Sequence, residues 1–356
     1  METTRLGRTN LRVTRTAFGL LPLQRTERTE AIRILRRAYD AGITFYDTAR
    51  AYTDSESKIG AALSDVRDQI VIATKTMATT REGVMKDIEV SLRELRTDHI
   101  DILQLHNPTA LPIPDDPQSS YAALRELRQQ GKIRFIGVTN HGVDRAEAAL
   151  TSGLYDTLQF PLNYLSAPQE LDLIDRCRKQ AIGLIAMKPL SGGLLTDPRP
   201  VFAFLRQHQN VVPIWGLQHM WELDELLNLD ANPPELDDAI RQRISQDRQE
   251  LAGDFCRACG YCLPCPAEIP IPMAARMPLL LRRMPHQQFM SADWNDKMGR
   301  IRDCRDCGHC RTHCPYTLDI PALLRKALND YEAFRAVELA NRCTDLVQTA
   351  PIPPRP

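Results

Sequence analysis

Eight short apolar segments recur along the first two thirds of the 356-residue chain, and they constrain its fold more than any other feature. They occupy residues 16–20, 43–47, 70–75, 100–106, 133–140, 155–160, 182–188 and 211–216. Segments that are apolar on both faces are typical of parallel strands buried beneath helices. Amphipathic helical patterns lie between most of them, for example Ala31, Ile34 and Leu35 on one face. This alternation predicts an α/β fold, a (β/α)8 TIM barrel.

The last third of the chain carries a duplicated cysteine run instead. Residues 256–266 read CRACGYCLPCP, and residues 304–315 read CRDCGHCRTHCP. After each final Cys-Pro, four residues precede an Ile-Pro pair, which indicates an internal duplication. The second run has the bacterial ferredoxin spacing C-x2-C-x2-C-x3-C-P. Such crowding favours two [4Fe–4S] clusters over zinc, whose structural sites usually take two well-separated cysteine pairs.

Eight cysteines are therefore predicted to be cluster ligands. They are Cys256, Cys259, Cys262, Cys265, Cys304, Cys307, Cys310 and Cys314. In two-cluster ferredoxins the cysteine before the proline binds the other cluster. This rule groups Cys314 with the first three cysteines, and Cys265 with the first three of the second run. The short gap between Cys262 and Cys265 leaves the pairing open.

An irregular, proline-rich stretch at residues 229–238 predicts the boundary between the two regions. We expect a barrel at residues 1–235 and a mainly helical, ferredoxin-like iron–sulfur domain at residues 236–356. The 45 basic side chains balance 45 acidic ones, so no net charge favours nucleic acid or an anionic membrane. No segment resembles a signal peptide or a membrane span, and we therefore predict a cytoplasmic location.

Four polar residues lie where predicted strands end, which is where barrel enzymes carry their chemistry. They are Asp47, Tyr52, Lys75 and His106. Each alone has a structural explanation, such as a helix cap for Asp47 or a rim histidine for His106. Together they predict an acid–base site in which Lys75, oriented by Asp47, lowers the pKa of the Tyr52 phenol. His106 would hydrogen-bond a substrate oxygen.

Residues 1 to about 230 resemble the aldo-keto reductases. The segments that carry the resemblance are LGRTNLRVTRTAFG, GITFYDTARAYTDSESKIGAAL, IVIATKT, SLRELRTDHIDILQLHN, GKIRFIGVTNH and MKPLSGGLL. With the cysteine region, the whole chain resembles the subgroup that carries a C-terminal ferredoxin-type domain. The resemblance implies an N-terminal hairpin before the barrel, a nicotinamide cofactor at its mouth and Tyr52 as general acid. The cofactor contacts expected with it are Thr139, Asn140, Gln159, Lys188, Leu190 and Gly216.

The stretch after the eighth strand departs from this family. Members that use NADP commonly have a Lys-Ser pair there, followed by an arginine for the 2′-phosphate. This chain has Gly216 and Leu217 at the pair and Glu222 near the expected arginine. Because a carboxylate repels a phosphate and can accept from a ribose hydroxyl, we expect NADH to bind at least as well as NADPH.

Three functions compete at this point. The chain could be a carbonyl reductase or alcohol dehydrogenase for a small molecule, with clusters that pass electrons to or from a protein or carrier. It could be the same enzyme with purely structural clusters, or a non-catalytic sensor of oxygen or redox state. The intact tetrad argues against the sensor. Hydride transfer moves two electrons, whereas an iron–sulfur cluster moves one at a time. A bound flavin could connect the two steps, but the sequence contains no recognisable flavin motif, and whether the protein binds a flavin is left open. The sequence leaves the substrate and the oligomeric state open as well.

Overall fold

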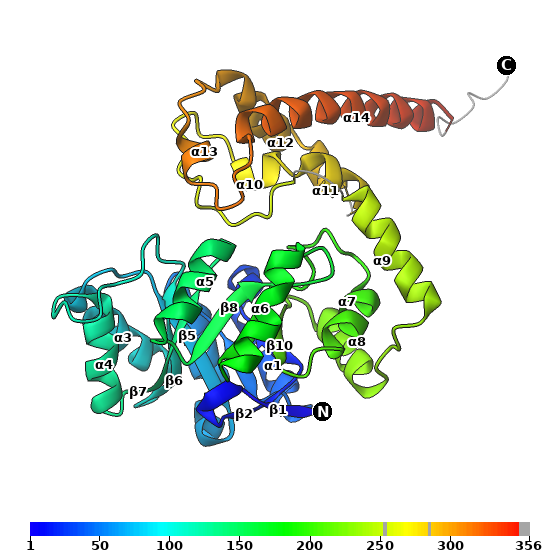
Figure 1. The fold of residues 1–356 in the computed structure, drawn as a ribbon. Coiled ribbons are helices and arrows are strands. Elements are labelled where there is room, and N and C mark those ends of the chain that lie inside the picture. Colours follow the sequence, from blue (N-terminus) through cyan, green and yellow to red (C-terminus); the bar gives the residue numbers. More distant parts are fainter. Residues whose placement is uncertain (252–254, 284–285, 349–356) are drawn as a thin grey trace, which may run out of the picture. The chain divides into compact units, whose positions relative to one another are not determined.

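The computed structural model describes residues 1–251, 255–283 and 286–348 (Figure 1). The chain folds as two units. One contains Met1–Ser191 and Asp197–Glu250, and the other contains Gly192–Thr196 together with the chain from Leu251 onward. The sequence placed the division after residue 235, whereas the structure places it after Glu250.

The first unit is a closed parallel barrel in which the strands follow one another in the order β10-β3-β4-β5-β6-β7-β8-β9 (Figure 1). The strands are β3 (Ala17–Gly19), β4 (Phe45–Asp47), β5 (Val71–Thr76), β6 (Ile100–His106), β7 (Ile133–Thr139), β8 (Thr157–Pro161), β9 (Gly183–Met187) and β10 (Val211–Gly216). Each of the eight predicted segments contains one of them or overlaps it closely. The predicted TIM barrel is confirmed.

Helices alternate with these strands. They are α1 (Arg28–Asp40), α2 (Ser55–Leu63), α3 (Arg81–Leu95), α4 (Ser120–Gln129), α5 (Val143–Ser152), α6 (Pro168–Lys179), α7 (Pro198–Arg206) and α8 (Met220–Ala231). Helix α1 buries the apolar face that its sequence predicts, including Ala31, Ile34 and Leu35. Side-chain caps begin other helices: Thr80 accepts from the Gly83 amide at α3, and Ser119 from the Ala122 amide at α4.

An antiparallel hairpin precedes the barrel, as the family resemblance implied. It consists of β1 (Thr3–Arg5) and β2 (Arg12–Thr14), joined through the short 3-10 helix Gly7–Thr9. Leu6, Leu11 and Val13 are buried in one cluster with side chains of the barrel interior. The hairpin thereby covers apolar surface at the N-terminal end of the strands.

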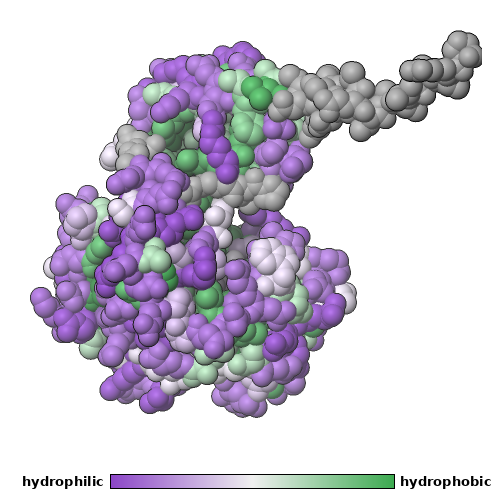
Figure 2. Space-filling view, turned by 90° about the vertical axis from the view of Figure 1, so that its right-hand side faces the viewer, coloured by the Kyte–Doolittle hydropathy of each residue, from purple (hydrophilic) through white to green (hydrophobic). Residues whose placement is uncertain are grey.

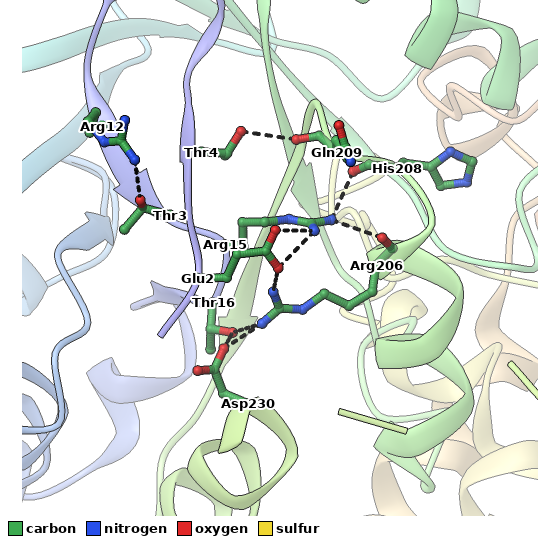
Figure 3. Close-up of polar contacts among 10 residues, drawn as sticks. All are labelled: Glu2, Thr3, Thr4, Arg12, Arg15, Thr16, Arg206, His208, Gln209 and Asp230. Carbon is green, nitrogen blue, oxygen red and sulfur yellow. Dashed lines mark hydrogen bonds and ion pairs between the residues drawn. The ribbon is translucent and has the colours of Figure 1, made fainter. Parts of the chain in front are cut away.

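A charged network ties this N-terminal segment to the barrel (Figure 3). Arg15 donates to both carboxylate oxygens of Glu2, at 3.0 and 3.1 Å, and to the carbonyl oxygens of Arg206 and His208. Arg206 pairs in turn with Glu2 and Asp230. The side chains of Arg15 and Asp230 are 5% and 4% exposed. These buried charges are therefore compensated by opposite charges, as burial requires.

Helix α9 (Asp238–Glu250) explains why the barrel unit extends beyond the proline-rich stretch. The Tyr164 hydroxyl donates to the Asp247 carboxylate at 2.6 Å, and Arg248 Nε donates to the Tyr164 carbonyl at 2.7 Å. Both contacts hold α9 to the loop after β8. A proline-rich segment therefore marks a turn here, and the unit boundary lies one helix later.

Helices are the only regular secondary structure of the second unit in the part of the chain that the structure describes. Its helices are α10 (Ile271–Ala274), α11 (Met277–Arg283), α12 (Ala292–Gly299), α13 (His309–Thr312) and α14 (Ile320–Gln348). Its core gathers aliphatic and aromatic side chains around Cys256, Cys262 and Cys310. On the face drawn in Figure 2, hydrophilic residues predominate and hydrophobic ones form smaller groups. The mainly helical C-terminal domain predicted from the sequence is confirmed.

Candidate active site and cluster ligands

The tetrad residues come from three neighbouring strands of the barrel. Asp47 is the last residue of β4, Lys75 lies in β5 beside its end, and His106 is the last residue of β6. Because β4, β5 and β6 are adjacent and parallel, their carboxyl ends meet at one rim. Tyr52 follows Asp47 in the loop before α2.

Lys75 and Asp47 form a buried ion pair. Lys75 Nζ lies 2.6 Å from Asp47 Oδ1 and also donates to the Thr48 carbonyl at 2.6 Å. Their side chains are only 1% and 2% exposed. Burial lowers the pKa of Lys75, and the charge of Asp47 opposes that shift. Removal of either partner would leave a buried charge without compensation.

Tyr52 lies against this pair. Lys75 Nζ is 5.2 Å from the centre of the Tyr52 ring, and the His106 ring meets the same phenol edge-on at 5.8 Å between centroids. Burial, reinforced by the charge of Asp47, raises the pKa of Tyr52. The predicted lowering by Lys75 is therefore wrong, because Asp47 neutralises the ammonium and desolvation dominates. The phenol stays protonated, which is the state a proton donor needs.

His106 is held as a neutral imidazole. Burial, followed by the charge of Lys75, lowers its pKa to about 3. Its Nδ1 atom is buried and has no hydrogen-bond partner among the described residues. A neutral imidazole has one N–H donor and one acceptor nitrogen. His106 can therefore hydrogen-bond a bound molecule without bringing a charge into the site.

Asn140 is the expected cofactor contact whose side chain has most hydrogen-bonding capacity left. It follows β7, is completely buried, and has no partner for Oδ1 or Nδ2 within the described parts of the chain. A buried amide without partners is costly. Its one acceptor and two donor hydrogens are complementary to a carboxamide, the group that nicotinamide presents. The chemistry of this donor set fits such a cofactor.

Thr139 and Gln159 already have partners within the protein. Thr139 Oγ1 accepts from the Asn107 amide at 2.9 Å. Gln159 Oε1 accepts from Gln104 Nε2 at 2.9 Å, and its own Nε2 lies 3.4 Å from Asp47 Oδ1. These contacts build the floor beneath the tetrad.

Gln104 belongs to this floor, although the sequence analysis did not select it. Its Nε2 donates to Asp47 Oδ2 at 3.1 Å and to Gln159, so it links the ion pair to the next strands. The sequence does contain a feature that points to Gln104. A glutamine in the middle of the apolar strand IDILQLH has to find partners inside the barrel.

The remaining expected cofactor residues lie at the same end of the barrel. Lys188 and Leu190 are partly buried in the turn after β9, where the Lys188 carbonyl accepts from Asn163 Nδ2 at 3.2 Å. Gly216 ends β10, and a Cβ there would lie 2.9 Å from Pro22 Cγ. Close packing against Pro22 is therefore by itself a sufficient reason for a glycine at position 216. Their role in cofactor binding stays a prediction.

Glu222 caps the N-terminus of α8. Its carboxylate accepts from the backbone amides of Gln218 at 2.7 Å and His219 at 2.9 Å. Free amides at a helix N-terminus commonly bind phosphate. Here the chain's own carboxylate takes both of these donors and adds negative charge at that position.

The cysteines of the second unit lie close to one another, and Cys262 lies near members of both runs. Cys262, Cys265, Cys304, Cys307 and Cys310 line one pocket. Cys256 is buried, which raises the pKa of its thiol, and the neighbours close enough to act on it include Cys259 and Cys314. The donor set thus fits thiolate ligation of iron–sulfur clusters.

Among the described residues, no three Cys, His, Asp or Glu side chains converge closely enough to hold a single metal ion. A [4Fe–4S] cluster makes a different demand, because each cysteine binds a different iron. Its thiolates therefore stand further apart than the ligands of one ion. The assignment of individual cysteines to a cluster stays a prediction.

Comparison with known proteins identifies both units. The model of the aldo/keto reductase family matches residues 15–233. The chain belongs to the aldo/keto reductase family. A second model, that of a 4Fe-4S dicluster domain, matches residues 255–319. This aldo/keto reductase is therefore an oxidoreductase with an iron–sulfur domain, and family membership implies a nicotinamide cofactor.

Individual relatives cover the barrel. L-galactose dehydrogenase of Arabidopsis thaliana is 31% identical over 219 residues, which are 56% of this chain and 69% of that protein. The NADH-specific methylglyoxal reductase of Escherichia coli is 30% identical over 193 residues, 48% of this chain and 59% of that protein. The holo form of an aldo-keto reductase from Bacillus halodurans matches the fold with a TM-score of 0.60 at 22% identity, covering 69% of this chain and 96% of that one. No helix in the described ranges has the length and apolar character needed to cross a membrane.

Proposed function

We propose that this aldo/keto reductase interconverts a small carbonyl compound and its alcohol at the barrel mouth, using a nicotinamide cofactor. The convergence of Tyr52 on the buried Lys75–Asp47 pair and on His106 carries the proposal. The open amide of Asn140 supports a cofactor with a carboxamide at this rim. Thr139 and Gln159, with Lys188, Leu190 and Gly216, are the further cofactor contacts that we propose.

The bound nicotinamide supplies the hydride chemistry. Tyr52 Oη gives its proton to the carbonyl oxygen as negative charge develops there. A phenol with a raised pKa does not ionise beforehand, and the much more basic alkoxide oxygen still draws its proton. Lys75 places a positive charge beside the phenolate that remains, and Asp47 fixes the position of that lysine. Neutral His106 orients the substrate oxygen by a hydrogen bond.

We propose NADH as the cofactor that binds at least as well as NADPH. The support comes from Glu222, which covers two amides of the α8 N-terminus and would repel a 2′-phosphate. One relative is named as NADH-specific, which is compatible with this choice within the family.

We propose that the eight cysteines bind two [4Fe–4S] clusters and that these pass electrons to or from a protein partner or a small carrier. Cys314 joins Cys256, Cys259 and Cys262 in one cluster, and Cys265 joins the other three in the second. Cys265 lines one pocket with Cys304, Cys307 and Cys310, which supports the second grouping, although Cys262 lines that pocket as well. The proximity of Cys314 to Cys256, and of Cys262 to Cys256 and Cys259, supports the first. The cytoplasmic location stays a prediction from the sequence.

The catalytic proposal is tested with Tyr52→Phe. We expect carbonyl-dependent oxidation of NADH or NADPH to fall by about 10²–10⁴-fold, the usual contribution of a general acid, while nicotinamide binding is preserved. Tyr39→Phe is the matched control. The Tyr39 hydroxyl lies on the outer side of α1, where it donates to the Gln69 side chain and takes no part in the site. Turnover by Tyr52→Phe within severalfold of the parent would reject the assignment.

The cluster proposal is tested on anaerobically isolated protein by iron, sulfide and flavin analysis and by freeze-quench EPR. We expect about eight irons and eight sulfides per chain for two [4Fe–4S] clusters. NAD(P)H, or dithionite where a carrier is missing, should reduce at least one cluster, and a carbonyl substrate should reoxidise it. Clusters that stay redox-silent in an enzyme that still reduces carbonyls would leave them a structural role.

A further inference from the structure

Within the described chain, Arg276 is a buried cation without a carboxylate partner. It lies between α10 and α11, and only 3% of it is exposed. Two other arginines of the described residues are comparably buried, and each has an acidic partner: Arg15 pairs with Glu2 at 3.0 Å and Arg67 with Asp101 at 2.8 Å. Arg276 Nη2 instead donates to the Gly192 carbonyl at 2.6 Å. A neutral carbonyl does not compensate a buried charge.

The guanidinium has further capacity to donate. Its Nε is buried and has no acceptor among the described residues. Gly192 leaves just enough room for the group, because a Cβ there would lie 3.3 Å from Arg276 Nη1. Gly192 also has a φ of +65°, a conformation that favours glycine. The loop is therefore shaped around the guanidinium and leaves one N–H without an acceptor in this part of the described chain.

The group that can supply a negative charge to Arg276 is Cys256, in its thiolate form. It is one of the predicted cluster ligands, is buried in the same unit, and lies near enough for its charge to act on Arg276. A cysteine that binds iron does so as a thiolate. A cluster bound through Cys256 would thus supply the missing negative charge.

We propose that Arg276 is a potential-setting residue, whose buried guanidinium holds a fixed positive charge against the cluster bound through Cys256 and raises the reduction potential of that cluster. This inference rests on the proposed binding of two clusters. Reduction adds one electron and no proton, so the reduced cluster carries one more negative charge than the oxidised one. A fixed cation stabilises the more negative form, and charge and hydrogen bonds to sulfur are known determinants of cluster potential.

No equally buried arginine accompanies the second cluster in the described chain, because Arg305, which lines the pocket with Cys304 and Cys307, is exposed. Arg311, in the second cysteine run, is exposed to solvent by more than a third of its side chain and pairs with Asp306 and Asp319. Its charge is screened by water and balanced by two carboxylates. The effect of Arg276 should therefore be larger on the cluster bound through Cys256 than on the other.

The test is an anaerobic redox titration of the full chain with dithionite, followed by EPR, on the parent and on Arg276→Gln. We expect one of the two potentials to become more negative by at least about 59 mV, a tenfold change in the one-electron equilibrium, and the other to shift by less. Arg276→Lys keeps the charge and should shift less. Arg282→Gln is the matched control, because it removes a charge of the same unit that pairs with Asp330 at the surface.

The outcomes are separable. A parent protein without iron and sulfide would reject the proposed clusters themselves. Clusters whose potentials are both unchanged in Arg276→Gln would reject the inference alone. If Arg276→Gln loses iron, the iron content of Arg276→Lys decides. Full occupancy in the lysine variant supports a role of the charge, and equal loss in both variants overturns it in favour of packing.

Discussion

At the N-terminal end of the barrel, Arg15 and Arg206 hold Glu2 and Asp230 in a network of mutual ion pairs (Figure 3). At the C-terminal end, one ion pair lies beneath buried polar atoms that have no partner among the described residues, on His106 and Asn140. Both ends bury charge. At the N-terminal end, Arg15 Nε is also without a partner among the described residues, but the other nitrogens of that guanidinium are all bonded, whereas both polar atoms of the Asn140 side chain at the mouth are open. Groups that stabilise a fold find partners within it, whereas groups that bind another molecule keep theirs open.

The largest effect should follow from Lys75→Met. Removal of this lysine takes the cation away from Tyr52 and leaves Asp47 buried without its partner. We expect turnover per folded molecule to fall by about 10²-fold or more, and the free energy of unfolding to fall by about 3 kcal/mol.

Lys58→Met is the control for this change. Lys58 is equally buried, but it donates to the Leu23 and Thr26 carbonyls and pairs with Asp54 at 2.9 Å, and none of these contacts is to a tetrad side chain. It should lose stability and keep its turnover. Urea unfolding and steady-state kinetics on the same preparations check both quantities, and equal turnover in the two variants would contradict the assigned role of Lys75.

Arg206→Met probes the opposite end of the barrel. Asp230 then loses its main partner while its side chain stays buried. We expect the free energy of unfolding to fall by about 2–3 kcal/mol with turnover unchanged. Arg199→Met removes an exposed cation from its pair with the partly buried Asp197 and should cost about 1 kcal/mol or less. If Arg206→Met is fully folded but has lost most of its activity, the structural role that we assign to this end of the barrel is wrong.

His106 should make stability depend on pH. Its pKa in the folded protein is about 3, against 6.5 when unfolded, so below pH 6.5 the unfolded chain binds a proton that the folded chain does not. Above pH 6.5 His106 is neutral in both states and does not lower the free energy of unfolding. It should fall by about 1.5 kcal/mol between pH 6.5 and pH 5. His106→Gln should flatten the profile that urea unfolding measures across this pH range.

Glu222→Gln should have the smallest effect. It removes one negative charge at the α8 N-terminus but keeps an acceptor for the Gln218 and His219 amides. We expect NADPH binding to improve relative to NADH by about two- to fivefold, as for a partly screened charge near a helix end. Fluorescence titration measures the ratio, with Asp224→Asn on the same helix as control. A parent that binds NADPH about tenfold more tightly than NADH would reject the preference itself.

The barrel could be predicted because its strands are buried on both faces and so read as apolar runs. The convergence of Asp47, Lys75 and His106 followed from the same pattern, since parallel strands bring their ends to one rim. The pKa of Tyr52 could not be predicted, because it depends on the balance between burial and a neutralised neighbour. The unit boundary depended on α9 and the contacts of Tyr164, which leave no mark in a linear pattern.

The segment Gly192–Thr196 has a consequence for how a protein of this kind can be divided or acquired. Leu194 lies in the core of the second unit and Gly192 accepts from Arg276, although both residues are encoded within the barrel sequence. A stop codon after Glu250 would leave Leu194 without the apolar neighbours that bury it. If residues from 251 onward were fused to another barrel, the core of their helices would lack Leu194. The loop between β9 and α7 and the C-terminal helices therefore depend on each other for this core, and a barrel cut off after Glu250 would expose Leu194.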